Sequence, residues 1–180
     1  MTKPSIYTIG HSTHPFKEFV QLLKKYRIEK LVDVRVLPYS KHNSQFNKEN
    51  LAKSLLKYRI QYIHMPGLGG HRRAEKNSPN SGWKNASFRG YADYMQTEAF
   101  EENLRELITL AKKNSTVIMC AEAVPWQCHR SLIADSLTLH GLEVKNIIDM
   151  MHEFPHQLNA MIKIKKGKIY YPAQNLFSEV

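Results

Sequence analysis

Short apolar runs alternate with longer amphipathic segments along most of this chain, and this alternation constrains the fold more than any other feature. Runs rich in β-branched and aliphatic residues predict strands, whereas apolar residues that recur at helical spacing predict helices between them. Strands that alternate with helices favour a mostly parallel sheet with helices on both faces. The predicted strands are residues 6–10, 30–36, 60–65, 116–121 and 144–148.

The segments between these strands carry signals for helix starts and ends. The first helix is expected to begin after Thr13 and Pro15, because both residue types are common at helix N-termini. The last is expected to end before Gly141, because glycine is favoured just past a helix C-terminus. The predicted helices are residues 16–26, 47–58, one or two within 88–113, and 127–140.

The whole chain, residues 1–180, is expected to form a single α/β domain. Two parts depart from the alternation. Residues 67–90 have no periodicity, are basic and are rich in Gly, Ser and Asn, so we expect a partly ordered basic lid-like loop. In the C-terminal extension, residues 150–180, apolar and basic residues alternate around Lys166-Gly167, which predicts a small hairpin.

Charge and cysteine content narrow the class of protein. The chain carries 26 Lys and Arg against 16 Asp and Glu, a net charge of +10. This surplus favours an anionic small molecule or nucleic acid as partner, although a solvated lysine surface would give the same surplus. No apolar run approaches the ~20 residues of a membrane span, and the start lacks the apolar stretch of a signal peptide. We therefore expect a cytoplasmic protein without a membrane partner, and both cysteines as free thiols.

Polar and reactive side chains follow the predicted strands where those strands end. In an open parallel sheet, ligands bind outside the carboxyl ends of the strands, so we expect these side chains to meet at one edge. This edge is the predicted site. Its members are His11, Ser12, Asp33, Arg35, Gly69, Gly70, Glu122, Cys128, His129 and Arg130.

Arg130 falls on the face of its helix that should pack on the sheet, among apolar residues. An inward-pointing guanidinium needs an anionic partner, because an unpaired buried charge is very costly. Asp33 or Glu122 would satisfy it within the fold. A bound anion near the free N–H groups of the helix start would satisfy it equally well.

Cys128 lies near the predicted start of that helix, where a thiol pKa is lowered. It is therefore a candidate nucleophile, with His129 or His11 as its base, or else a small apolar residue in a tight turn. Cys120 stands in an apolar strand and is interpreted as a core residue. Because Cys120, Glu122, Cys128 and His129 match no zinc spacing, no metal site is predicted.

Asp33 and Glu122 are candidates for a general acid/base pair. Pairing with Arg35 and Arg130 would instead make them structural, and this reading is slightly favoured. His11 follows a strand and a glycine, so it is expected to be exposed at the edge. There it would carry protons or serve as a hydrogen-bonded structural residue. The sequence indicates neither a cofactor nor an oligomeric state.

The motifs that stand out along the chain are Thr8-Ile9-Gly10-His11-Ser12, Asp33-Val34-Arg35, Pro38-Tyr39-Ser40, Leu68-Gly69-Gly70, Phe88-Arg89-Gly90-Tyr91, Cys120-Ala121-Glu122 and Cys128-His129-Arg130. In this order they resemble the domain-of-unknown-function 488 family. The resemblance covers most of the chain, from about Ile6 to about Asp149, and the joint set of motifs is specific. It implies a single α/β domain. Because no activity is assigned to the family, the resemblance supplies no reaction, cofactor or catalytic residue.

The leading hypothesis is a small enzyme that binds an anionic, phosphate-bearing substrate, a nucleotide or nucleic acid, at the carboxyl edge of the sheet. The alternative is a non-catalytic nucleic-acid-binding module that uses the basic loop and the lysine-rich tail. The expected catalytic residues are His11, Asp33, Glu122, Cys128 and His129. The expected ligand-binding residues are Ser12, Arg35, Tyr39, Ser40, Gly69, Gly70, Tyr91 and Arg130.

Overall fold

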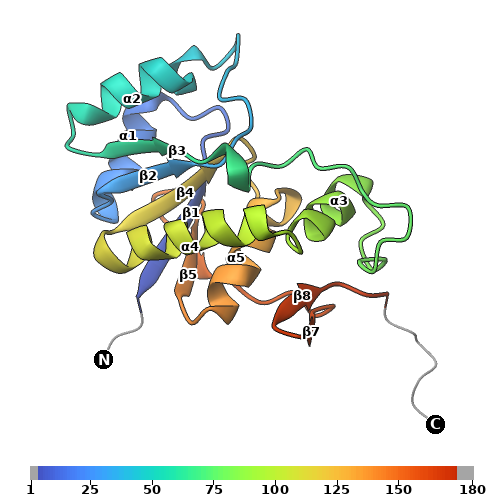
Figure 1. Cartoon of the computed structure of the whole chain (residues 1–180). Coiled ribbons are helices and arrows are strands. Elements are labelled where there is room, and N and C mark those ends of the chain that lie inside the picture. The colour runs from blue at the N-terminus through green and yellow to red at the C-terminus, as the bar shows by residue number, and fades with distance from the viewer. Residues whose placement is uncertain (1–3, 174–180) are drawn as a thin grey trace.

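The structure is a computed structural model that describes residues 4–173 (Figure 1). The strands of its main sheet are β1 (Ser5–Gly10), β2 (Lys30–Asp33), β3 (Gln61–His64), β4 (Thr116–Cys120), β5 (Glu143–Ile147) and β6 (Glu153–Pro155). They lie in the order β3-β2-β4-β1-β5-β6. The first five strands are parallel, and β6 pairs antiparallel with β5. The predicted mostly parallel sheet is confirmed, and β6 is an addition that the sequence pattern did not indicate.

The helices lie close to their predicted positions, and the region predicted to hold one or two helices holds two. They are α1 (Phe16–Lys25), α2 (Lys48–Leu56), α3 (Ala86–Tyr94), α4 (Glu98–Lys113) and α5 (Arg130–Leu139), with 3-10 turns η1 (Ser44–Phe46), η2 (Pro66–Leu68) and η3 (Pro125–Gln127). Residues 88–113 divide into two helices because extended Thr97 ends one and caps the next, its side chain accepting from the N–H of Phe100. Helix α5 begins at Arg130, after the predicted residue 127, because Cys128 has extended backbone angles.

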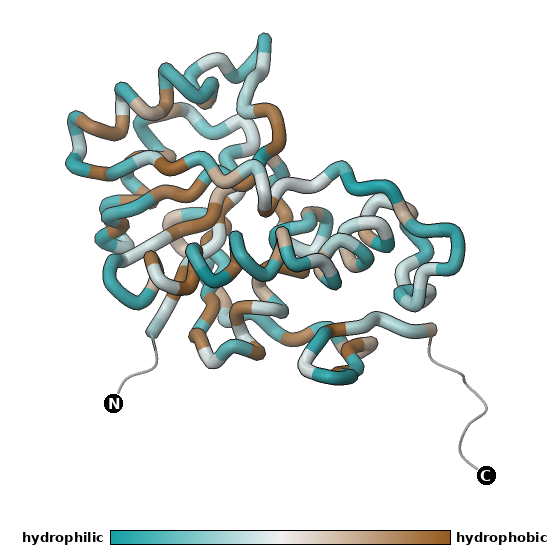
Figure 2. Tube along the Cα trace, viewed as in Figure 1, coloured by the Kyte–Doolittle hydropathy of each residue, from teal (hydrophilic) through white to brown (hydrophobic). Residues whose placement is uncertain are grey.

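Alternating side chains of the parallel strands form a core on each face of the sheet. On one face, Val32 and Ile118 pack with apolar residues of α3, α4 and α5. On the other, Leu31 and Val117 pack with residues of α1 and α2. Figure 2 shows the apolar residues concentrated along the central strands. The sheet is therefore buried on both sides, and its open surface for a ligand lies at the strand ends.

The strand order places a topological switch point between β1 and β4. From β1 the chain passes through α1 to β2 on one side, whereas from β4 it passes through α5 to β5 on the other. Helix α1, which follows β1, and helix α5, which follows β4, thus cover opposite faces of the sheet. A crevice opens between the carboxyl ends of these two adjacent strands. Such crevices are where open α/β sheets bind ligands.

Residues 69–85 contain no helix or strand (Figure 1). Hydrogen bonds to α3 nevertheless fix this segment. The buried Asp93 carboxylate of α3 accepts from the N–H of Glu75 (2.9 Å), the hydroxyl of Ser78 (2.5 Å) and the side-chain amide of Asn80 (2.8 Å). Trp83 stacks on Phe88 with 4.8 Å between ring centroids. The segment predicted as a lid-like loop is thus attached to α3 by these contacts.

The C-terminal extension includes the predicted hairpin, formed by β7 (Lys163–Lys165) and β8 (Lys168–Tyr170). Lys166 and Gly167 both have positive φ, 51° and 75°, as a tight two-residue hairpin turn requires. Residues 174–180 of the expected extension lie outside the described residues. Among residues 4–173, none of the helices has the length and apolar character that crossing a bilayer would require.

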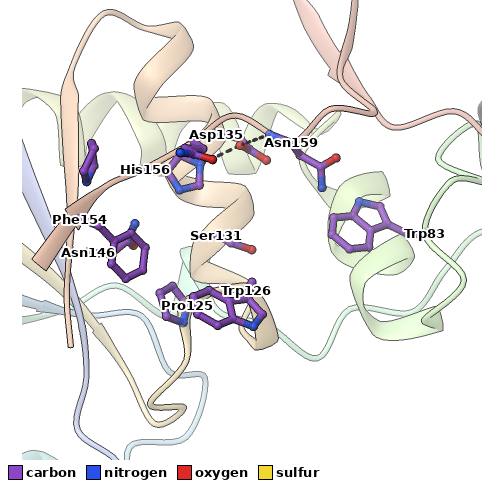
Figure 3. Close-up of a pocket in the computed structure, with 11 residues that line it drawn as sticks. Trp83, Pro125, Trp126, Ser131, Asp135, Asn146, Phe154, His156 and Asn159 are labelled. Carbon is purple, nitrogen blue, oxygen red and sulfur yellow. Dashed lines mark hydrogen bonds and ion pairs between the residues drawn. The ribbon is translucent and has the colours of Figure 1, made fainter. Parts of the chain in front are cut away.

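Asp135 of α5 fastens this extension to the domain (Figure 3). Its carboxylate accepts from His156 Nε2 (2.8 Å), the N–H of Asn159 (3.2 Å) and the hydroxyl of Tyr171 (2.8 Å). Burial and the neighbouring Asp135 carboxylate raise the pKa of Tyr171, so that phenol stays protonated as a donor. Beside Asp135 is a cavity of about 410 Å³ with Trp126 and Phe154 on its walls. All three groups on Asp135 lie within the fold, which makes this a structural anchor.

We expect Asp135→Ala to lower the free energy of unfolding by about 2–4 kcal/mol, because Tyr171 and His156 would keep buried polar groups without their partner. Urea denaturation followed by circular dichroism measures this loss. Asp149→Ala removes a carboxylate that contacts exposed His152 and is the control, with little change expected. A loss no larger for Asp135→Ala than for the control would contradict the anchor.

Candidate functional site

Two adjoining clefts open at the switch point. The thiol cleft, about 560 Å³, is lined by residues that include Cys120, Cys128, His129, Gly70, His71 and Phe88. The serine cleft, about 470 Å³, is lined by residues that include His11, Ser12, Thr13, Tyr39, Ser40 and Ala123. Arg35, Leu37, Ala121 and Glu122 belong to both clefts and form the wall between them. The structure therefore brings most of the predicted site residues to one edge of the sheet.

Arg35 is fixed by a bidentate ion pair with Asp33. Its Nε and one terminal nitrogen lie 2.9 and 2.6 Å from the two carboxylate oxygens, and the same terminal nitrogen donates to the carbonyl of Phe46 at 2.7 Å. Tyr62 donates its hydroxyl to Asp33 at 2.7 Å. Asp33 is fully buried and its oxygens are occupied. It therefore orients Arg35, and its predicted acid/base role has no free oxygen to use.

His11 is buried, although it was expected to be exposed at the sheet edge, because Phe46 stacks on its ring with 4.4 Å between centroids. Its Nδ1 lies 2.9 Å from the carbonyl of Ser12, so Nδ1 carries the proton and donates. The remaining nitrogen, Nε2, accepts from Arg35 at 3.1 Å. Burial and the Arg35 charge lower the pKa of His11 and keep it neutral. Nε2 thus holds Arg35, while the Ser12 carbonyl fixes the ring through Nδ1.

The turn after β4 is held from inside the protein by Arg130, which is fully buried. Its two terminal nitrogens donate to the carbonyl oxygens of Glu122 (2.5 Å) and Ala123 (2.9 Å). The predicted carboxylate partners, Asp33 and Glu122, are wrong, because main-chain carbonyls take the place of their side chains. At Gly10 an added Cβ would lie 1.8 Å from the same Glu122 oxygen. Glycine here therefore lets the turn approach β1.

This arrangement fixes the direction of the N–H groups in the turn. A trans peptide points its C=O and the following N–H in opposite directions. Because Arg130 draws the carbonyls of Glu122 and Ala123 inward, the N–H groups of Ala123 and Val124 point away from it. Among the described residues, neither N–H donates a hydrogen bond. Ala123 lines the serine cleft, so the turn offers donors to that space.

Two of the N–H donors at the start of α5 are already used. Ser131 and Leu132 donate their N–H groups to the carbonyls of Cys128 and His129, each at 3.0 Å. These bonds continue the 3-10 turn η3 into the helix. The N–H of Arg130 bonds the Cys128 sulfur, so this end of α5 serves the thiol cleft.

The two thiols lie together, and their electrostatics differ from the prediction. Hydrogen bonding from the Cys128 thiol, with a smaller contribution from His129, lowers the pKa of Cys120 to about 3. The contact with Cys120 and burial raise the pKa of Cys128. Cys120 lies in the buried core, as interpreted from the sequence, and it also has the lower thiol pKa of the pair, with Cys128 as its hydrogen-bond donor. The Arg130 charge and N–H at the start of α5 favour a lower pKa of Cys128, as expected, but Cys120 and burial outweigh them.

His129 is held between the glycine turn and α3. Its Nδ1 lies 3.7 Å from Cys128 Sγ, and its ring centroid lies 4.9 Å from that of Tyr91. A Cβ on Gly70 would lie 2.9 Å from the same Nδ1, so only glycine leaves room for the imidazole. His129 Nε2 is buried without a hydrogen-bond partner among the described residues.

The remaining predicted ligand-binding residues fall into two groups. Ser12, Tyr39 and Ser40 line the serine cleft. Tyr91 is fully buried and donates its hydroxyl to the carbonyl of Leu68 at 2.8 Å, so it supports the site from behind. Gly69 is buried against Val36, where an added Cβ would lie 2.5 Å from a methyl carbon. The site residues that sequence reasoning missed are Cys120, Phe46 and His71.

A family model with the description "Domain of unknown function DUF488" matches residues 15–137. The chain belongs to this family. The matched region begins just after His11 and includes Arg35, Cys120, Cys128 and His129, so it contains most of the DUF488 site. No curated protein and no solved structure matched the chain.

The chemistry available at this DUF488 site follows from its geometry. Arg35 and the outward N–H groups of the turn can bind negative charge, while the exposed Glu122 side chain can exchange protons. Two sulfur atoms and an imidazole lie beside them in the thiol cleft. Anion binding and proton transfer are therefore within reach of one another.

In the reduced, chelator-treated protein, we expect iodoacetamide to modify Cys120 before Cys128. Since the lowered pKa keeps Cys120 as thiolate, its alkylation rate should change little between about pH 8 and about pH 5. Peptide mapping by mass spectrometry measures both rates, and Cys120→Ser is the control for the site. A rate for Cys120 that falls about tenfold per unit below about pH 8 would show an ordinary thiol.

Proposed function

We propose that this DUF488 protein is an enzyme that binds an anionic, phosphate-bearing substrate, a nucleotide or nucleic acid, at the carboxyl edge of its sheet. The observation that carries the proposal is the meeting of Arg35, the outward N–H groups of the turn after β4, and the Glu122 carboxylate around two adjoining clefts. A phosphate group needs several converging donors, and this edge provides them.

Arg35 supports the proposal because its guanidinium is both fixed and partly unused. Asp33 accepts from Nε and from one terminal nitrogen, which also donates to the Phe46 carbonyl. The other terminal nitrogen donates one N–H to His11. The second N–H of that last nitrogen has no partner among the described residues, and Arg35 lines both clefts. A donor fixed in this way loses little side-chain entropy when it binds an oxygen atom.

The turn after β4 supplies the second set of donors. The N–H groups of Ala123 and Val124 are held outward by the Arg130 contacts on the opposite side of the peptides. Free main-chain N–H groups in a turn can form anion-binding hollows without any charged side chain, and Ala123 lines the serine cleft. The substrate's phosphate would lie between this turn and Arg35.

Glu122 is the proton carrier in this proposal. It is exposed and belongs to the wall shared by both clefts, so it can reach a bound group from either side. The polar atoms of Asp33 and His11 are all engaged, by Arg35, Tyr62 and the Ser12 carbonyl, which leaves Glu122 as the free carboxylate among the predicted acid/base residues. Its negative charge opposes phosphate binding in the ground state, which gives a test with two opposite readouts.

The competing function is a non-catalytic nucleic-acid-binding module. Lys163, Lys165 and Lys166 of the C-terminal hairpin line a separate shallow hollow together with Tyr170. A stack of basic side chains beside an aromatic ring suits a single-stranded nucleic acid. Binding through this surface would weaken steeply with salt and would not depend on the clefts.

We expect Glu122→Gln to raise the affinity for inorganic phosphate about two- to fivefold, because a like charge is removed. The same change should lower turnover of phosphate esters about 10²- to 10⁴-fold, because the proton carrier is lost. Titration calorimetry measures the first effect. Product release from a panel of nucleoside phosphates and a short RNA measures the second.

Glu106→Gln on the outer side of α4 removes the same charge away from the clefts and is the matched control. It should change neither quantity. Phosphate binding that is indifferent to Glu122→Gln, together with RNA binding abolished by Lys163→Gln, Lys165→Gln and Lys166→Gln, would contradict the enzyme and support the module.

A further inference from the structure

Three potential metal ligands lie together at the floor of the thiol cleft. The sulfur atoms of Cys120 and Cys128 and an imidazole nitrogen of His129 all lie within 4.8 Å of one another. The residues come from the end of β4 and from the segment between η3 and α5. Spacing along the chain gave no metal motif, because the fold and not the sequence brings Cys120 next to the Cys-His pair.

The separations suit a tetrahedral ion of zinc size. Metal–sulfur bonds of about 2.3 Å and metal–nitrogen bonds of about 2.0 Å put neighbouring ligand atoms about 3.5–3.8 Å apart in a tetrahedron. Cys128 Sγ and His129 Nδ1 are 3.7 Å apart. The other two pairs of ligand atoms, which involve Cys120 Sγ, are at most 4.8 Å apart. Small side-chain rotations of up to about 1 Å would bring them to the tetrahedral separations.

The surroundings of these atoms are those of an incomplete polar cluster. Cys120 and Cys128 are 8% and 3% exposed and are free thiols in the structure. The Nε2 atom of His129 is buried without a hydrogen-bond partner among the described residues. The imidazole atom that faces Cys128 is Nδ1, so the atoms that a bound ion would satisfy are Nδ1 and the two buried sulfurs, and the case for the ion rests on their grouping.

The cluster is held in place before any ion binds. Cys120 lies between β1 and β2, and its carbonyl accepts from the N–H of His11 at 2.9 Å. The Tyr91 ring and the Gly70 backbone confine the His129 imidazole from two sides. Ligands fixed by a rigid sheet end lose little freedom when they bind a metal.

The geometry points to a site for one zinc-class divalent cation, bound by Cys120, Cys128 and His129, with a fourth position open to the thiol cleft. Two thiolates and an imidazole favour zinc and similar borderline-soft ions over magnesium or calcium, which prefer oxygen ligands. Three protein ligands with one open position are typical of catalytic rather than structural zinc sites.

This site deepens the proposed function, on which its role rests. The fourth ligand would be a water molecule whose proton passes to the Glu122 carboxylate, two residues beyond Cys120. The resulting hydroxide would attack the phosphorus of the bound ester and form a P–O bond. The bond to the leaving alkoxide would break, and that oxygen would take the proton from Glu122. The reaction is hydrolysis and needs only water as co-reactant.

The test is titration of the reduced, chelator-treated full chain with Co²⁺ and then Zn²⁺. We expect one Co²⁺ per chain, with sulfur-to-cobalt charge-transfer absorption and the visible bands of tetrahedral cobalt, both lost when Zn²⁺ displaces it. Cys120→Ser, Cys128→Ser and His129→Gln should each weaken Zn²⁺ binding at least about 100-fold. His140→Gln at the exposed end of α5 is the control and should leave binding unchanged.

Gly70→Ala is a second variant that keeps all three ligands. It should weaken binding about 10-fold by displacing the imidazole, and circular dichroism verifies that each variant is folded. Cobalt spectra without sulfur-to-metal absorption, or Zn²⁺ affinity unchanged in the Cys120→Ser protein, would overturn the site. Failure of metal binding with formation of a Cys120–Cys128 disulfide in air would assign the pair to redox chemistry.

The two proposals can fail separately. Phosphate binding to the metal-free chain tests the anion site alone, and Co²⁺ binding without phosphate tests the metal site alone. Loss of the first with retention of the second would leave a metal site without the proposed substrate. The reverse would leave an anion site that uses another source of nucleophile.

Discussion

The buried guanidinium of Arg130 is the group on which the geometry of the site depends. It lies under the turn after β4 and binds the carbonyls of Glu122 and Ala123. Among the described residues no carboxylate lies within ion-pair distance of it, so these carbonyl dipoles and the rigidity of the turn offset its desolvation. Gly10 permits the close approach that this contact needs. The outward N–H groups follow from it.

A second buried network fixes the opposite wall of the clefts. Asp33 holds Arg35 in a bidentate pair, and His11 and the carbonyl of Phe46 occupy most of its other directions. The turn and this arginine come from β4 and β2, which pair directly in the sheet. The sheet thus sets the distance between the N–H groups of the turn and the Arg35 guanidinium, the two proposed sets of donors to an anion. The proposed metal ligands lie in the thiol cleft, on the other side of the residues that separate the two clefts. In the proposed reaction, one site would bind a phosphate group and place water beside it.

The fold was predictable from sequence because periodicity and turn residues report local structure directly. The carboxyl-edge site was predictable too, since the parallel order of strands decides which residues meet. Roles within it were harder. Arg130 was recognised as inward-pointing, but its carbonyl partners depend on the path of a four-residue turn. Cys120 was correctly interpreted as core, but an apolar strand gives no sign that this side chain also lines the thiol cleft. Its pairing with Cys128 is tertiary, and no spacing rule shows it.

The central claim is that the turn after β4 and Arg35 together bind a phosphate group. A crystal structure of the protein grown in phosphate tests it most directly. The account predicts an anion in the serine cleft, with oxygen atoms at hydrogen-bond distance from the N–H of Ala123 and from the free N–H of Arg35. Phosphate bound at the lysines of the C-terminal hairpin, with the serine cleft holding water alone, would contradict it.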